Sequence, residues 1–214
     1  MTKNNSKNKD YFTQRNNELK PNGACNVTSM INALNAASWP VAQLATGKFS
    51  QPEDALMDFI LTDRQIQDLW RKKDPKGLYP PNEWHEILCY GTNLFLEEKK
   101  LIHDGKPAVE WGDRRSVSDL VRTLDSGGSA VLRGLFKYNG KDIGHVVCLA
   151  GYEKDSCGQI RNWIIDDPFG DYRTGYKGVN GNDIVMPMDD FQRMIRPENN
   201  GLKHAHLVRM FKEC

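Results

Sequence analysis

The sequence has no long hydrophobic run, and this absence limits where the chain can act. No apolar stretch reaches about 18 residues, the length that a membrane-spanning helix needs. The first 20 residues also lack an apolar stretch of signal-peptide length. We therefore expect no membrane insertion and no secretion by the usual route. The expected location is the cytoplasm, with delivery outside the cell by another system left open.

Cysteine pairs and a dominant charge are missing as well. The five cysteines are odd in number and widely scattered, which argues against a disulfide framework and favours a reducing compartment. No C-x-x-C pair occurs, so a zinc ribbon and a thioredoxin-like site are excluded. The 29 basic and 28 acidic residues give a formal charge of +1, too small to create the strong field that favours nucleic acid.

The remaining composition suits one folded domain. At 214 residues with 39% hydrophobic side chains, the chain is long and apolar enough to bury a core. Residues 1–10 are rich in Lys and Asn and are expected to form a flexible tail. Within a single domain over 11–214, residues 11–115 predict a mainly helical lobe and residues 116–214 a mainly sheet lobe. The expected fold class is α+β, with an antiparallel sheet.

Hydrophobic spacing and turn residues predict where the elements lie. The helices are expected at 25–39, 52–60, 63–72, 83–90, 116–125 and 189–195. The strands are expected at 129–136, 144–153, 160–165, 184–187 and 205–211. The strand at 144–153 is too continuously apolar for a half-exposed strand, so we expect it in the centre of the sheet.

Cys25 lies at an unusual place for a cysteine kept only for packing. Asn22 and Gly23 are expected to cap the helix that it opens. Apolar residues from Val27 to Leu34 recur at helical spacing and form the stripe that must be buried. On a helical wheel Cys25 lies roughly 160° from Val27, so its thiol points away from this stripe. A helix N-terminus favours the nucleophilic thiolate.

A nucleophilic thiol needs a base, and the base needs a group that orients it. His145 begins the strand at 144–153. If this strand and the next one form a hairpin with a five-residue loop, His145 stands opposite Asp167, where Pro168 ends the ladder. Cross-strand neighbours have Cβ atoms about 5 Å apart, so a carboxylate can reach an imidazole nitrogen. A register shift of one residue would put Asp166 or Pro168 there instead.

Other histidines and cysteines form weaker groups. His85 and Cys89 share a helix face at i, i+4, as metal ligands can, but a third ligand is missing and packing is the expected role. His204 and His206 alternate along the last strand, where a solvent-exposed edge is expected. We therefore predict no metal site and no cofactor.

Several short motifs, taken in order, resemble a known enzyme family. The matching residues are Gln14, Cys25 at a helix start, Gly144-His-Val-Val, Gly151-Tyr152 and Asp167-Pro-Phe-Gly-Asp-Tyr172. This order is similar to the papain-like cysteine peptidases, and most closely to their bacteriocin-processing-like branch. The resemblance covers residues 11–37 and 116–190 and implies a papain-like fold.

The resemblance also implies a role for each residue. Cys25 would be the nucleophile, His145 the general base and acid, and Asp167 the residue that orients His145. Gln14 would donate a hydrogen bond to the oxyanion beside the Cys25 backbone N–H. Gln14 lies eleven residues before Cys25, farther than in papain, so Asn17 and Asn22 remain alternative donors. The expected reaction is hydrolysis of a peptide or protein substrate through an acyl-enzyme.

Two other functions remain open from the sequence. One is an amidase or endopeptidase for cell-wall peptides of the phage or bacterial type. The other is a non-catalytic binding protein built on the same fold. The sequence leaves the oligomeric state undetermined.

Overall fold

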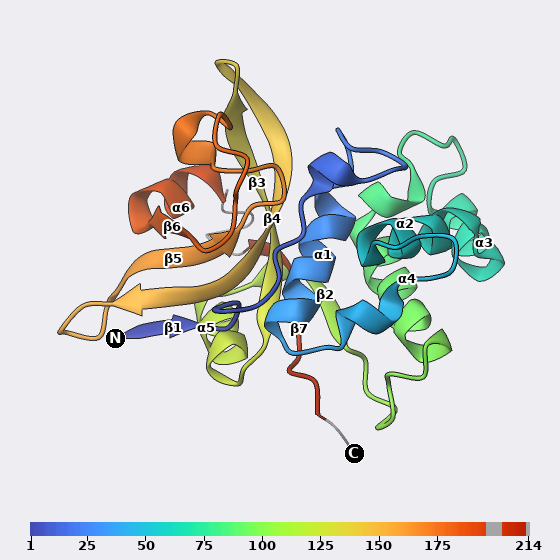
Figure 1. Cartoon of the computed structure of the whole chain (residues 1–214), viewed down its shortest axis with the longest axis horizontal. Helices are drawn as coiled ribbons and strands as arrows, with labels where there is room; N and C mark the ends of the chain where they lie inside the picture. The colour runs from blue at the N-terminus through green and yellow to red at the C-terminus, as the bar shows by residue number, and fades with distance from the viewer. Residues whose placement is uncertain (196–202, 213–214) are drawn as a thin grey trace.

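The computed structural model describes residues 1–195 and 203–212, and it divides them into a helical side and a sheet side (Figure 1). Helices α1 to α4 lie on one side of a curved antiparallel sheet, and α5 and α6 lie on the other. The α+β class predicted from the sequence is confirmed. No helix among the described residues is long and apolar enough to cross a membrane.

The helical side begins at the candidate nucleophile. Its helices are α1 (Cys25–Ala36), α2 (Pro52–Thr62), α3 (Arg64–Lys73) and α4 (His85–Glu98), with short 3-10 turns η1 (Gln14–Asn16), η2 (Val41–Leu44) and η3 (Pro81–Glu83). Local chemistry explains their starts. Pro52 occupies the first turn of α2, and the Asp63 carboxylate accepts the Ile66 N–H at 3.0 Å to cap α3.

Helix α1 is buried almost all round, and not only along the apolar stripe that its spacing predicts. Val27, Ile31 and Leu34 pack into the core with the other helices, as their spacing predicts. The polar face is buried as well, because it packs on the sheet: Ser29 Oγ donates to the Val146 carbonyl at 2.9 Å. Asn32 on the same face bonds the main chain of Phe12. Main-chain partners satisfy this face in place of water.

The strands form one antiparallel sheet. They are β1 (Thr2–Asn4), β2 (Val109–Arg115), β3 (Ser129–Tyr138), β4 (Lys141–Lys154), β5 (Ile160–Asp166), β6 (Ile184–Pro187) and β7 (Lys203–Val208). Their order is β2-β7-β3-β4-β5-β6, and β1 also pairs with β4. The long apolar strand β4 is an interior strand, as the sequence predicts.

Two hydrophobic cores cover the two faces of this sheet. One contains the apolar residues of α1, α2 and α4 together with Val131, Val146 and Cys148. The other lies under α5 (Val117–Asp125) and α6 (Met188–Met194) and contains Val147 and Leu149 of the same strand β4. Because successive side chains of a strand point to opposite faces, β4 contributes to both cores.

The first residues of the chain form a short strand within 1–10, the segment for which the sequence predicts a flexible tail. Strand β3 pairs with β4 only as far as Leu149. Strand β1 pairs with the next residues of β4, 151–153. The Asn5 amide then donates to the carbonyls of Leu124 and Gly128. These contacts are made by main chain and amides, so a polar composition alone does not reveal them.

The structure differs from the sequence prediction in two further places, strand β2 and the position of β7 in the sheet. The range 109–115 falls within the predicted helical lobe, yet it forms the strand at one end of the sheet. Its charged residues leave no clear alternation of apolar side chains, which is typical of an edge strand. Strand β7 lies inside the sheet between β2 and β3, so His206 is buried and the prediction of an exposed edge is wrong.

Candidate active site

Cys25 lies at the start of α1 on the wall of a cavity of about 600 Å³. Both the helical side and the sheet contribute to the lining of this cavity. Trp84 and His85 line it from the start of α4, and Arg133 and His145 line it from β3 and β4. Cys25 is half-buried and carries a free thiol. The cleft therefore gives a ligand access to both the sulfur and the imidazole.

His145 and Asp167 form a buried pair beside this cleft. Nε2 of His145 lies 2.7 Å from Oδ1 of Asp167, and the two side chains are 4% and 0% exposed. The imidazole has only two ring nitrogens, so Nδ1 is the one left for Cys25. Cys25 lines the same cavity as His145 and is close enough to contribute to the raised pKa of the imidazole.

The pair meets diagonally across the sheet, because the strand register differs from the predicted one. The ladder pairs Cys148 with Asp166, so Asp167 continues it opposite Val147, two residues from His145. The predicted register is offset by two residues because the loop lies one residue later, at 155–159. At this end of the ladder an offset of two keeps the side chains on their predicted faces, whereas an offset of one would reverse them. Diagonal neighbours on one face remain within reach.

The surroundings of His145 favour the imidazolium. Burial lowers the pKa of His145, but the charge and hydrogen bond of Asp167, together with Cys25, outweigh it and raise the pKa to about 10. An imidazolium next to a thiol at a helix N-terminus favours the thiolate. The arrangement places an imidazolium and a helix N-terminus beside the Cys25 thiol, the surroundings in which cysteine nucleophiles are found.

Several groups fix Asp167 in place. Its Oδ1 also accepts the Phe169 N–H at 2.9 Å, and the Tyr11 hydroxyl donates to its carbonyl at 2.5 Å. The ring of Tyr176 contacts His145 edge-on, with centroids 6.0 Å apart. Burial and then the Asp167 charge raise the pKa of the Tyr176 phenol far above its ordinary value. Sequence reasoning missed both tyrosines, because each is a single residue in a loop with no motif around it.

Asp166 points away from the imidazole, although it is the next residue in the chain. Its Oδ1 accepts the Asp183 N–H at 2.9 Å, behind the candidate pair. Burial, with the Asp183 charge adding, raises the pKa of Asp166 to about 7, although the bond from the Asp183 N–H acts against this. The alternation of side chains along β5 thus separates the two aspartates.

Of the three candidate oxyanion donors, Asn22 lines the cleft. Gln14 is buried next to the site, since its N–H donates to the Pro168 carbonyl at 2.9 Å. Its Nε2 donates to the Pro21 carbonyl at 3.0 Å. Asn17 is buried and accepts the Lys20 N–H at its side-chain oxygen.

Three of the other histidines, His85, His204 and His206, form a packed cluster with Trp111. His85 stacks on Trp111 with ring centroids 4.5 Å apart, and His206 contacts the His85 carbonyl at 3.0 Å. The Cys89 thiol donates to the Val109 carbonyl instead of joining His85. Among the described residues no group of three His, Cys, Asp or Glu side chains is placed to hold a metal ion.

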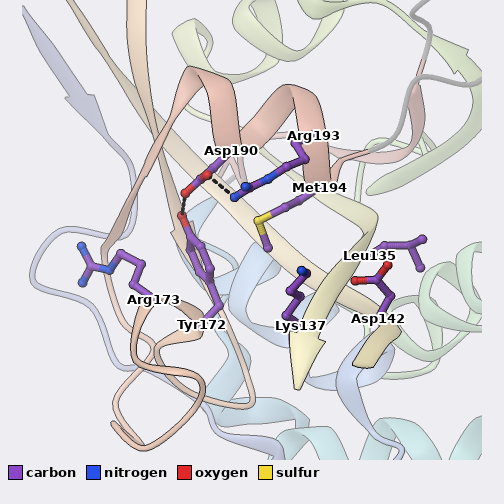
Figure 2. A pocket seen from close by; sticks show the side chains of 8 residues that line it. All are labelled: Leu135, Lys137, Asp142, Tyr172, Arg173, Asp190, Arg193 and Met194. Carbon is purple, nitrogen blue, oxygen red and sulfur yellow. Dashed lines mark hydrogen bonds and ion pairs between the residues drawn. The ribbon is translucent and has the colours of Figure 1, made fainter. Parts of the chain in front are cut away.

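A second cavity of about 520 Å³ lies between β3, β4 and α6 (Figure 2). Its carboxylate Asp190 is already bonded by the Tyr172 hydroxyl at 3.0 Å and by Arg193 at 2.5 Å. Lys137 of β3 also points into it (Figure 2). Neither cysteine nor histidine is among its lining residues. The first cavity is therefore the candidate active site.

Comparison with known proteins adds one finding. A family model described as the Peptidase_C39-like family matches residues 6–185, which include Cys25, His145 and Asp167. A search of curated proteins gave no match.

Proposed function

The chain belongs to the Peptidase_C39-like family, and from this membership we propose that it is a papain-like cysteine peptidase that hydrolyses peptide bonds through an acyl-enzyme. One observation carries the proposal: His145 is bonded to the buried Asp167 through Nε2 and lines the same cleft as Cys25. This is the arrangement of nucleophile, base and orienting acid that acyl transfer requires.

Each residue has one task in the proposed reaction. The Cys25 sulfur attacks the carbonyl carbon of the peptide, and the His145 imidazolium protonates the leaving amine. His145 then takes a proton from water, which attacks the thioester and releases Cys25. Asp167 keeps Nδ1 of His145 directed at the sulfur and stabilises the imidazolium.

The developing oxyanion needs donors on the α1 side of the cleft. The Cys25 N–H is one, because the first N–H groups of a helix have no partner within it. We assign the second to Gln14, whose Nε2 uses one proton for Pro21 and has another to donate. Asn22 at the cleft wall is the alternative. Within the papain-like peptidases we place the chain nearest the bacteriocin-processing-like branch, on its Gly144-His and Asp167-Pro motifs.

The test is peptide hydrolysis by four matched proteins. Cys25→Ala is expected to abolish turnover of an unstructured peptide. Asp167→Asn is expected to lower kcat by about 10²- to 10⁴-fold, because the imidazole loses its orienting charge. Asp166→Asn, the same change one residue earlier, should keep kcat within about twofold of the wild-type chain, since Asp166 does not contact His145. Full activity of Cys25→Ala, or equal losses in the two asparagine variants, would refute the proposal.

A further inference from the structure

Arg133 brings an unpaired positive charge to the cleft. It lies on β3, where its partner in the register is Val146, and the neighbouring pair is Gly134 with His145. Its side chain is exposed and lines the same cavity as Cys25 and His145. Within the described ranges 1–195 and 203–212 it forms no ion pair.

The other groups in the cavity do not neutralise Arg133. Glu83, the one carboxylate that lines the cavity, is paired with Lys20 at 3.1 Å. On the remaining side lies His85, whose pKa is lowered to about 3 by burial and then by the charges of His206, Arg133 and His204. Arg133 thus faces neutral imidazole and aromatic groups, with no carboxylate of its own.

We propose that this peptidase selects substrates with a carboxylate side chain close to the scissile bond, and that Arg133 is the residue that binds this carboxylate. The inference rests on the proposed function and names its substrate class. Strands lie about 4.8 Å apart, so Arg133 starts one strand away from His145. An extended substrate advances about 3.4 Å per residue. The side chain of Arg133 therefore reaches substrate residues within about three positions of the bond cleaved.

The experiment measures binding separately from catalysis. The Cys25→Ala protein is titrated with a set of peptides in which a single Glu occupies each position within three residues of the cleavage site. Matched peptides carry Gln, which has the same shape without the charge. Binding is followed through tryptophan fluorescence, since Trp84 lines the cleft.

At one or two of these positions Glu peptides should bind about two- to fivefold more tightly than Gln peptides, the range of a solvent-accessible ion pair. When Arg133→Gln is added to the Cys25→Ala protein, the ratio of the affinities for Glu and Gln peptides should fall close to one. Adding Lys137→Gln is the control, because it removes the same charge from the same strand but points into the other cavity (Figure 2).

Equal binding of Glu and Gln peptides at every position, absence of binding, or equal effects of the two added variants would each overturn the inference. Hydrolysis of the same peptides by the wild-type chain is measured in a separate assay. Turnover of Glu and Gln peptides at equal rates would leave the peptidase assignment standing and remove only the specificity. Conversely, a charge-dependent difference in binding without any turnover would refute the peptidase assignment alone.

Discussion

Two consecutive buried aspartates have different partners, because the chain alternates its side chains at the end of β5. Asp167 is bonded to His145 and to the Phe169 N–H, whereas Asp166 is buried beside Asp183. The sequence alone could not separate them, since a shift of one residue would exchange their roles. The strand register decides which carboxylate meets the imidazole.

Asp166 makes the stability of the protein depend on pH. Its folded pKa of about 7 lies above the ordinary value for Asp, so the folded state holds a proton that the unfolded chain releases. The contribution of Asp166 to the free energy of unfolding is therefore most favourable below about pH 4. This contribution is lost as the pH rises from about 4 to about 7. Asp166→Asn removes the ionisation and keeps an oxygen to accept the Asp183 N–H.

We expect Asp166→Asn to raise the free energy of unfolding at pH 8 relative to the wild-type chain. The upper limit is about 4 kcal/mol, because about three pKa units at roughly 1.4 kcal/mol each are involved. Urea denaturation of both proteins at pH 5 and pH 8 measures the effect, and the difference between them should grow with pH. The same difference at both pH values would contradict the assigned pKa.

At the scale of elements, strand β1 depends on a glycine of its partner strand. Gly151 pairs with Asn4, and a Cβ atom at Gly151 would overlap the Lys3 carbonyl oxygen and stand 2.9 Å from the Asn4 Cα. These neighbours are main chain and cannot turn aside. The absence of a side chain at Gly151 is thus what lets the first residues approach β4.

Gly151→Ala should therefore weaken the docking of β1. We expect the free energy of unfolding to fall by about 1 to 3 kcal/mol, as for other overpacked sites, and the first residues to become sensitive to protease. Gly144→Ala on the same strand is the control, because a Cβ there meets nothing within 4 Å. Equal stability of the two variants in urea denaturation would show that β1 does not need the glycine.

Sequence patterns predicted the elements that carry their own signals. Helix α5 begins with a capping box between Ser116 and Asp119, and β4 is a continuous apolar run, so both were predicted near their observed bounds. Strands β1 and β2 were missed because their pairing depends on main-chain bonds to distant strands. The turn after β4 was placed one residue early, because the Asp155 carboxylate that anchors it, through the Cys157 and Gln159 N–H groups, is not visible as a pattern.

At the scale of the whole molecule, the candidate site lies where the helical side meets the sheet. Cys25 comes from one side and His145 from the other, and Ser29 of α1 bonds the main chain of Val146 next to His145. The sequence predicted the individual residues and their two lobes. It could not predict Arg133 and Tyr176 as neighbours of the site, since only the packing of segments distant in the sequence brings them there.

The most direct test of the catalytic arrangement compares two thiols within one molecule. The wild-type chain is treated with iodoacetamide at pH 6, and the labelling rates of Cys25 and Cys157 are measured by peptide mass spectrometry. Cys157 is an exposed turn cysteine and serves as the internal reference, whereas Cys25 is only half-exposed. Because the imidazolium of His145 favours a thiolate at Cys25, we predict that Cys25 reacts at least about ten times faster. Labelling of Cys157 at an equal or greater rate would contradict the account.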